Sequence, residues 1–423
     1  MEWLGQAKIN YTHSPDPISL KKKDGSDTTL LEICEQSTPP CNLNPLLFNG
    51  HLQTCWTAIK SDGPPLYYKR KVFEAENTSY AGSFCVDFVT QPSSGSSPDP
   101  DLPPRTTYFS DDEFVGIASL DSRPMLVALH GLSGGSYEVY LKHCLAPLVG
   151  AEGEKQWEAC VVNSRGCAHH KITSSVLFNA RSTWDCRQTV KWLRQKFPNR
   201  PLFGIGFSLG ANILTNYVCE EGSNCELRAA VVLSSPWNLD VGSVGLQNTS
   251  IGLFYSSVMC GNLKKLAEKH KEQLIKNSKL DFKKLSETKY LHEFDRAIQC
   301  PTWGYPTEGA YYRDASSVDL LHAARIPIFA VNATDDPIAL KQSLPYQEIQ
   351  QTPYVILCTT SMGGHLSWFE IGGRRWHARP ATNFLNKMAF EVESVVPVVE
   401  PVKADEDDLL AGRFNPLRRK WQM

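Results

Sequence analysis

From residue 124 to about residue 360, the sequence alternates short apolar runs with segments that suit loops and helices. The runs lack polar residues at every second position, which is typical of strands that are buried on both faces. Such an alternation predicts a mainly parallel sheet with helices on both faces. The runs are MLVALH, EACVVN, LFGIGF, RAAVVLSS, IPIFAVN and YVILCT. Two further β-rich stretches lie at 67–73 and 83–89, and helix-like segments lie at 182–197, 209–220 and 380–391.

The alternation is interrupted once, by about 85 residues of largely helical character between RAAVVLSS and IPIFAVN. We interpret this segment as a helical cap inserted into a single α/β core. The predicted parts are an N-terminal extension packed on the core at 1–60, the first part of the core at 61–236, the cap at 237–321, the second part of the core at 322–400 and a C-terminal tail at 401–423.

Charge and cysteine content argue against several classes of protein. The 43 Lys and Arg residues nearly balance the 45 Asp and Glu residues and are scattered, so no basic surface for nucleic acid is expected. The 13 cysteines contain no C-x-x-C pair and are interpreted as reduced, mostly buried thiols. The N-terminus has no signal-like apolar region, and no apolar run reaches the roughly 18 residues of a membrane span. We therefore expect a cytoplasmic protein without a transmembrane segment.

The pentapeptide GFSLG at 206–210 follows one apolar run directly and precedes a helix-like segment. This context fits the nucleophile elbow, a sharp turn between strand and helix that exposes a serine at the head of the helix. Flanking glycines let the chain turn without side-chain clashes, and the helix dipole favours a developing negative charge. Three fixed positions in five also arise by chance in loops, but the strand before and the helix after favour Ser208 as a nucleophile.

A nucleophilic serine needs a base and an acid that orients the base, and in this kind of sheet they follow in the order Ser, Asp or Glu, His. Asp335 and Asp336 follow the run IPIFAVN, and His365 follows YVILCT after two glycines. The carboxyl ends of parallel strands meet at one edge of the sheet, where open α/β sheets assemble their sites. We expect His365 to be the base, the alternative being an ordinary core or surface histidine.

Adjacent aspartates cannot be oriented from sequence alone. We favour Asp336 as the orienting acid, because the following Pro337 disfavours the helical region for it and holds it extended. Asp335 would then stabilise the loop, and the reverse assignment stays open.

An oxyanion hole requires two backbone N–H groups aimed at the acyl carbonyl oxygen. The loop HGLSGG at 130–135 follows the run MLVALH, so we expect the N–H groups of Leu132 and Leu209 to be the donors. The loop lacks the spacings of nucleotide-binding motifs, and no cofactor is expected. Cys167, His169 and His170 crowd another loop, but further ligands are not evident, so no metal site is expected.

Together these segments resemble the YheT-type branch of the α/β-hydrolases, which includes medium-chain fatty acid ethyl ester synthase/esterases and related monoacylglycerol lipases. The resemblance covers roughly residues 40–395. It rests on NPLLFNGHLQT at 44–54, LHGLSGGS at 129–136, VVNSRGCA at 161–168, GIGFSLGANIL at 204–214, EFD at 293–295, YYRDASS at 311–317, NATDDPI at 332–338 and GGHLSWFE at 363–370. It implies an α/β-hydrolase fold, a triad of Ser208, Asp336 and His365, and lipid-ester metabolism in the cytosol or at a membrane surface.

The leading functional hypothesis is a serine esterase that cleaves a small hydrophobic ester, of a medium-chain acyl or monoacylglycerol type, through an acyl-serine intermediate. One alternative is transfer of the acyl group from acyl-CoA to an alcohol by the same triad. Others are a biosynthetic hydrolase for a polyketide or peptide ester, and a binding protein that keeps the pocket without the chemistry. No histidine is followed five positions later by aspartate, so the H-x-x-x-x-D motif of some acyltransferase relatives is missing.

The cap is expected to close over the acyl chain. The apolar residues predicted to line that pocket, with packing inside the cap as the alternative, are Ile251, Leu253, Phe254, Val258 and Met259.

Overall fold

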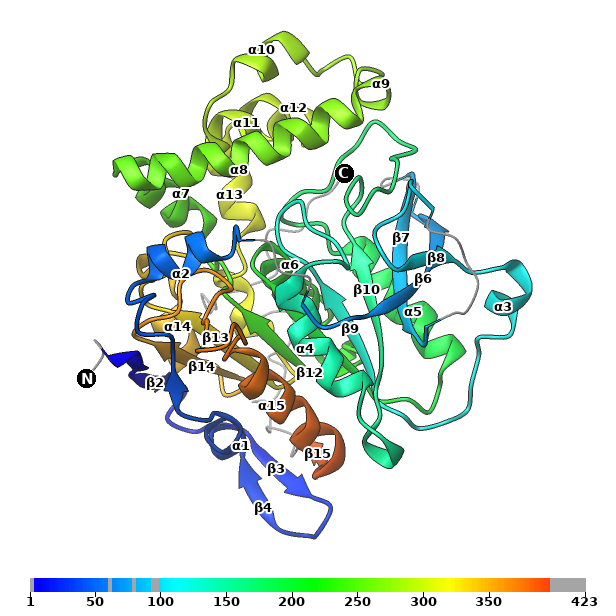
Figure 1. Cartoon of the computed structure of the whole chain (residues 1–423), viewed down its shortest axis with the longest axis vertical. Helices are drawn as coiled ribbons and strands as arrows, with labels where there is room; N and C mark the ends of the chain where they lie inside the picture. Colours follow the sequence, from blue (N-terminus) through cyan, green and yellow to red (C-terminus); the bar gives the residue numbers. More distant parts are fainter. Residues whose placement is uncertain (1–3, 60–62, 78–80, 93–98, 396–423) are drawn as a thin grey trace, which may run out of the picture.

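The computed structural model describes residues 4–59, 63–77, 81–92 and 99–395, and a ten-stranded sheet forms its centre (Figure 1). In sheet order the strands are β2 (Ile9–Thr12), β14 (Val355–Thr360), β13 (Ile328–Ala333), β12 (Leu227–Leu233), β11 (Leu202–Phe207), β9 (Met125–Leu129), β10 (Glu158–Asn163), β7 (Ser83–Thr90), β6 (Tyr67–Glu74) and β8 (Thr106–Tyr108). From β14 to β10 the six neighbouring strands are parallel, whereas β2 and β7 pair antiparallel with the strands at the two ends of this block. The predicted mainly parallel sheet is confirmed.

The six apolar runs of the sequence are the six parallel strands. Every residue of β9, β11, β13 and β14 is buried, because helices cover both faces of the sheet. This burial explains why the runs have no polar residue at alternate positions. The two β-rich stretches that precede them correspond to β6 and β7.

Two layers of helices cover the sheet. One contains α1 (Leu30–Ser37), α4 (Val139–Val149) and α15 (Ala378–Phe390), and the other contains α5 (Trp184–Lys196), α6 (Leu209–Glu221) and α14 (Tyr346–Gln350). The predicted helices correspond to α5, α6 and α15. The sequence did not predict α4, because it begins without a side-chain cap and contains Pro147, two features that argue against a helix.

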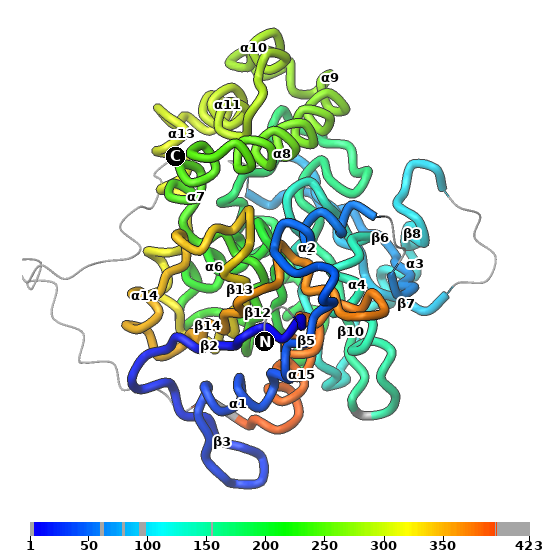
Figure 2. The backbone as a smooth tube through the Cα atoms, turned by 60° about the vertical axis from the view of Figure 1, so that its left-hand side comes forward, coloured from blue at the N-terminus to red at the C-terminus, as the bar shows by residue number. Residues whose placement is uncertain are grey.

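The N-terminal residues take part in the sheet as well as packing on the core. Strand β2 forms an edge of the central sheet beside β14, as Figure 2 also shows. Other N-terminal strands form two small sheets. One sheet pairs β1 (Gln6–Ala7) with β5 (Cys41–Asn42). The other contains β4 (Asp27–Thr29), β3 (Ser19–Lys22) and the C-terminal strand β15 (Val392–Val395). Helix α2 (Gly50–Trp56) follows them, and the short α3 (Asp111–Val115) follows β8. Strands of two to four residues carry too few positions for a periodic signal, so the sequence did not predict them.

Seven helices between β12 and β13 form a layer above the sheet in Figure 1, here called the cap. They are α7 (Leu239–Gln247), α8 (Ser250–Lys269), α9 (Lys271–Leu274), α10 (Phe282–Glu287), α11 (Leu291–Ala297), α12 (Gln299–Trp303) and α13 (Glu308–Ala315). The cap has its own apolar cluster, in which Leu263 and Phe294 pack with Leu177 and Phe178 from the loop after β10. The cap therefore rests on the core through apolar contacts.

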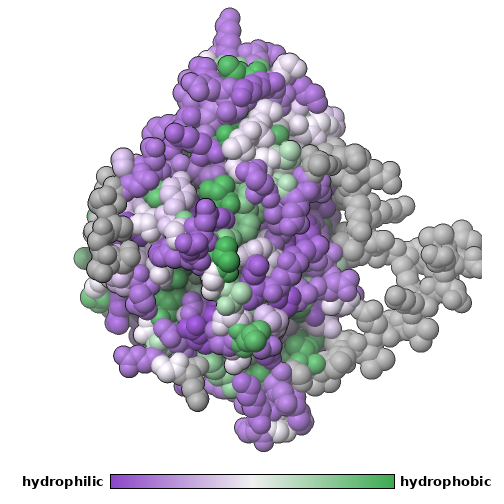
Figure 3. All heavy atoms as spheres, turned by 90° about the vertical axis from the view of Figure 1, so that its right-hand side faces the viewer, coloured by the Kyte–Doolittle hydropathy of each residue, from purple (hydrophilic) through white to green (hydrophobic). Residues whose placement is uncertain are grey.

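Hydrophilic residues predominate on the face turned to the viewer in Figure 3, including the tip of the cap. Apolar residues occur there in small, separate groups. None of the helices in the described ranges combines the length and the apolar character that crossing a membrane requires. The predicted tail at 401–423 lies outside the described residues.

Candidate active site

Ser208 occupies a strained turn between β11 and α6. Its backbone has φ 53° and ψ −119°, a conformation that non-glycine residues rarely adopt. The flanking glycines are required by close packing. A Cβ on Gly206 would lie 2.6 Å from the Cα of Ala211, and one on Gly210 would lie 2.3 Å from the carbonyl oxygen of Leu129. The GFSLG pattern therefore has a steric cause, and the turn presents the hydroxyl of Ser208 at the start of α6.

His365 connects the serine to an aspartate. Its Nε2 lies 2.8 Å from Oγ of Ser208, and its Nδ1 lies 2.8 Å from Oδ2 of Asp336. An ionised carboxylate only accepts hydrogen bonds, so Nδ1 carries the proton and Nε2 accepts from the serine hydroxyl. The structure thus brings together the three residues that the sequence predicted, in the arrangement of a nucleophile, a base and an orienting acid.

The two neighbouring aspartates have different surroundings. Asp336 is 3% exposed, and its Oδ1 accepts the backbone N–H groups of Ile338 and Ala339 at 2.8 and 2.9 Å while Oδ2 faces the histidine. Oδ1 of Asp335 accepts the N–H of Gly364 at 3.0 Å, and its Oδ2 is buried without a partner among the described residues. Burial raises the pKa of Asp335 to about 6. Only Asp336 combines contact with the histidine and full engagement of both oxygens.

Helix α2 holds the loop that carries the histidine, a role that the sequence analysis did not assign. The hydroxyl of Thr54 accepts the N–H of His365 at 2.9 Å and donates to the carbonyl of Gly50 at 2.6 Å. The buried Gln53 accepts the N–H of Phe369 at 2.7 Å. These residues belong to the stretch NPLLFNGHLQT, which supported the family resemblance and was the available signal for this role.

The predicted oxyanion donors flank Ser208. Leu132 and Leu209 both border the cavity beside the serine, and no hydrogen bond among the described residues occupies their backbone N–H groups. The loop before Leu132 is fixed, because the N–H of Gly131 donates to the hydroxyl of the buried Tyr140 at 2.8 Å. Two free N–H groups beside the hydroxyl of Ser208 match what binding of an oxyanion requires.

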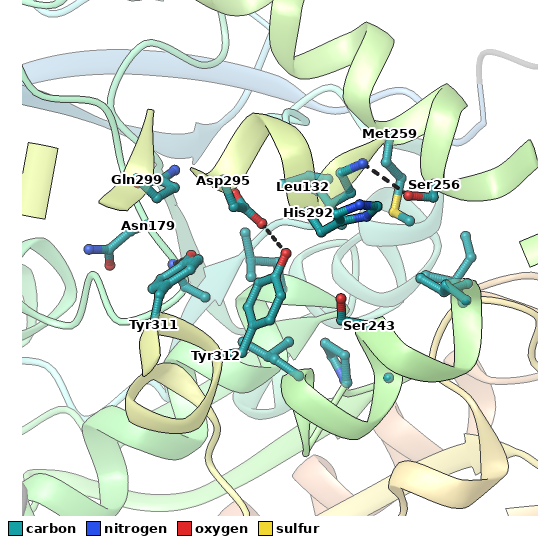
Figure 4. Close-up of a pocket in the computed structure, with 18 of the residues that line it drawn as sticks. Leu132, Asn179, Ser243, Ser256, Met259, His292, Asp295, Gln299, Tyr311 and Tyr312 are labelled. Atoms are coloured by element: carbon teal, nitrogen blue, oxygen red, sulfur yellow. Dashed lines mark hydrogen bonds between the residues drawn. The ribbon is translucent and has the colours of Figure 1, made fainter. Parts of the chain in front are cut away.

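A cavity whose lining includes Ser208 and residues of the cap lies between the core and the cap (Figure 4). Much of its wall is apolar, as in other sites for small hydrophobic ligands. Six of the apolar lining residues are Leu132, Leu209, Leu246, Met259, Leu263 and Ile338.

Comparison with known proteins identifies the family. Residues 124–370, more than half of the chain, match the family model described as alpha/beta hydrolase fold. The chain belongs to the α/β-hydrolase family. This hydrolase is 33% identical over 420 residues to a monoacylglycerol lipase of Saccharomyces cerevisiae, covering 91% of each chain. It is 29% identical to medium-chain fatty acid ethyl ester synthase/esterase 2 of the same yeast, covering 82% of this chain and 85% of the relative.

Human phospholipase ABHD3 is a third relative, 28% identical to this hydrolase over 323 residues, with 76% of this chain and 72% of the relative covered. The relatives include both kinds of enzyme that the sequence resemblance named, which confirms that resemblance.

The predicted lining of the hydrolase pocket was wrong for most of the residues named. Ile251, Phe254 and Val258 are 46%, 58% and 47% exposed, and Leu253 does not border the cavity. Met259 does line it, together with Ser256 and Leu263 from the same helix, α8. A helix turns one stripe of residues three and four positions apart toward its neighbour, and the residues named by hydrophobicity lie mostly on other faces.

The cysteines of this hydrolase are mostly buried, and the loop residues Cys167 and His170 take part in packing and hydrogen bonding. All of the thirteen cysteines but Cys55 and Cys225 are buried, which agrees with the prediction that most of them are buried. Cys167 packs in the apolar cluster of the cap, and Nε2 of His170 lies 3.4 Å from Oγ of Ser83. Within the described residues, no group of three or more His, Cys, Asp or Glu side chains is placed to hold a metal ion.

Proposed function

We propose that this hydrolase cleaves medium-chain fatty acyl esters or monoacylglycerols through an acyl intermediate on Ser208. The observation that carries this proposal is the hydrogen-bonded series Asp336–His365–Ser208, with both distances 2.8 Å, at the end of a largely apolar cavity. The names of the two yeast relatives support the choice of ester. We assign the roles of orienting acid, base and nucleophile to these three residues in that order.

The proposed reaction has two halves. His365 accepts the proton of Ser208 as the hydroxyl attacks the acyl carbonyl, and Asp336 stabilises the resulting imidazolium. The backbone N–H groups of Leu132 and Leu209 bind the oxyanion. The alcohol then leaves with the proton from His365. Water attacks the acyl-serine as His365 accepts its proton, and His365 returns this proton to Ser208 as the acid leaves.

Acyl transfer is the second candidate function. The acyl-serine would lie under the cap in an apolar cavity, which limits access of water and allows an alcohol to compete as acceptor. The ester synthase/esterase among the relatives agrees with this alternative. Acyl-CoA as donor and a biosynthetic ester as substrate remain further hypotheses that use the same residues.

Labelling and turnover test the proposed function together. A fluorophosphonate probe should label Ser208, and acyl esters of medium length should exceed acetyl esters in kcat/KM by roughly tenfold or more, since each buried methylene contributes about 0.8 kcal/mol. Adding ethanol to the assay separates hydrolysis from acyl transfer by the product formed. A protein that is labelled but turns over none of the esters from acetyl to dodecanoyl would contradict the proposal.

Chain-length preference should depend on the wall of the cavity. Met259→Trp should lower kcat/KM for decanoyl and dodecanoyl esters by about tenfold relative to butanoyl esters, because the larger ring removes space for about two methylenes. Phe254→Trp is the matched control on the same helix, because Phe254 is 58% exposed. Equal chain-length profiles in both variants and the wild type would remove Met259 from the acyl site.

We further propose that the protein works in the cytoplasm and makes peripheral contact with lipid surfaces. Ten of the sixteen large apolar side chains that are exposed among the described residues lie on two segments, called here the apolar face. It consists of Leu46, Phe48, Leu52, Trp56, Ile59, Val241, Val244, Ile251, Phe254 and Val258. The first segment includes α2 and the second α7 and α8, and the two meet where Nδ1 of His51 lies 3.1 Å from the hydroxyl of Tyr255. A concentration of apolar side chains of this kind suits an interfacial contact.

The double substitution Phe48→Asp and Phe254→Asp should reduce co-sedimentation with phosphatidylcholine vesicles at least fivefold, because it places charge on the apolar face. Turnover of a water-soluble butanoyl ester should not change. Val115→Asp is the control, since Val115 is 82% exposed on α3, outside this face. Equal vesicle binding by the double variant and the control would exclude the apolar face as the contact.

A further inference from the structure

Asp295 is a buried carboxyl group in the wall of the same cavity, and the proposed reaction does not use it. It lies on α11, is 5% exposed and accepts the hydroxyl of Tyr312 from α13 at Oδ2, with an O–O distance of 2.6 Å. Figure 4 shows the two side chains pointing toward each other where they border the cavity. Burial raises the pKa of Asp295 to about 7, so the ionised and neutral forms coexist near neutral pH.

No cation among the described residues compensates this carboxyl group. The next residue in the chain, Arg296, pairs with Glu308 instead, and the charge of Glu308 itself raises the pKa of Asp295. A buried carboxylate without a cationic partner costs stability, so its position suggests a use other than folding.

The second oxygen of Asp295, Oδ1, accepts no hydrogen bond within the described part of the chain. Two neighbouring polar side chains that line the cavity already bond to the protein backbone. Gln299 donates to the carbonyl of Phe178 at 3.1 Å, and the hydroxyl of Tyr311 accepts the N–H of Ala180 at 2.8 Å. Asp295 therefore retains at Oδ1 the capacity to accept a hydrogen bond from a ligand in the cavity.

We propose that Asp295, positioned by Tyr312, forms a hydroxyl-binding subsite, and that the preferred substrates are esters that carry a free hydroxyl group. A hydroxyl group donates to a carboxylate and accepts from a carboxylic acid, so it matches Asp295 in both protonation states. A purely alkyl ligand would cover Oδ1 and leave it without a partner. The hydroxyl group belongs either to the alcohol part of the ester, as in a partial glyceride, or to the acyl chain. This inference rests on the proposed ester hydrolysis at Ser208.

Three octanoyl-type esters test the subsite: glycerol 1-octanoate, propyl octanoate, and propyl 8-hydroxyoctanoate. The wild type should favour at least one hydroxylated ester over propyl octanoate by roughly 10- to 100-fold in kcat/KM. The favoured ester identifies which part of the substrate carries the hydroxyl group. Asp295→Leu should remove this preference with little change for propyl octanoate, and Asp295→Asn should retain most of it, because the amide still forms hydrogen bonds.

Asp314 provides a matched control. It is also buried, accepts the hydroxyl of Tyr305 at 2.7 Å and pairs with Arg181 at 2.6 Å, but it does not border the cavity. Asp314→Asn should lower thermal stability and leave the preference among the three esters unchanged.

Dissociation constants of the three esters for Ser208→Ala protein make the test independent of turnover. Tighter binding of a hydroxylated ester that is lost with Asp295→Leu supports the subsite even if hydrolysis is absent, in which case only the proposed function fails. Equal binding and turnover of all three esters by the wild type would overturn the subsite and leave ester hydrolysis in place. An equal loss for all three in Asp295→Leu would assign Asp295 a purely structural role.

Discussion

Replacing Ser208 with alanine is expected to lower kcat for ester hydrolysis by at least about 10⁴-fold. In the proposed reaction the hydroxyl group supplies the nucleophile, and within the described residues Oγ of Ser208 is the only atom that forms a hydrogen bond with Nε2 of His365. Alanine adopts the same turn with similar strain, so the fold should persist. Steady-state hydrolysis of an octanoyl ester measures the loss, and thermal unfolding measures the stability.

Ser37→Ala is the control for this substitution. Ser37 is a fully buried serine in α1, where its hydroxyl donates to the carbonyl of Ile33 at 2.6 Å. This variant should keep the activity of the wild type and its labelling by fluorophosphonate. If Ser208→Ala hydrolysed esters at an ordinary rate, the nucleophile would be a different residue.

The sequence predicted the central strands of the sheet, whose residues nearly all lie in the buried, apolar interior. The strands β9 to β14 are buried on both faces, so their apolar runs are continuous and easily recognised. GFSLG was equally informative, because close contacts exclude a side chain at Gly206 and Gly210. The order of the triad then follows from the order of the strands.

Features that depend on contacts distant in sequence were not predictable. Strand β2 is an edge strand of four residues, and only its pairing with β14 gives it a defined place. Thr54 supports His365 across 311 positions of sequence, which no local pattern indicates. The face that α8 turns to the cavity depends on how the cap packs, so hydrophobicity alone selected Phe254, which is exposed. The sequence showed which residues are apolar, but it did not show which of their side chains point into the cavity.

The second large expected effect is a loss of kcat on replacing Asp336, the aspartate that contacts His365. Asp336→Asn should lower kcat by roughly 10³- to 10⁴-fold. The amide oxygen can still accept the N–H groups of Ile338 and Ala339, which leaves the NH₂ group facing Nδ1 of His365. That contact favours the tautomer with the proton on Nε2, so the histidine can no longer accept the proton of Ser208.

Asp335→Asn should cost less than about tenfold in kcat, because an amide oxygen can still accept the N–H of Gly364 in place of Oδ1. The pKa of Asp335 is raised to about 6 in the folded protein from an ordinary value near 4, so the fold loses stability as the pH rises between these two values, and the loss levels off above pH 6. The asparagine variant avoids that cost, and its melting temperature relative to the wild type should be higher at pH 8 than at pH 5. Octanoyl ester kinetics and melting curves of both variants check these expectations. A larger loss of kcat with Asp335→Asn than with Asp336→Asn would transfer the role of orienting acid to Asp335, against the 2.8 Å contact between Asp336 and His365.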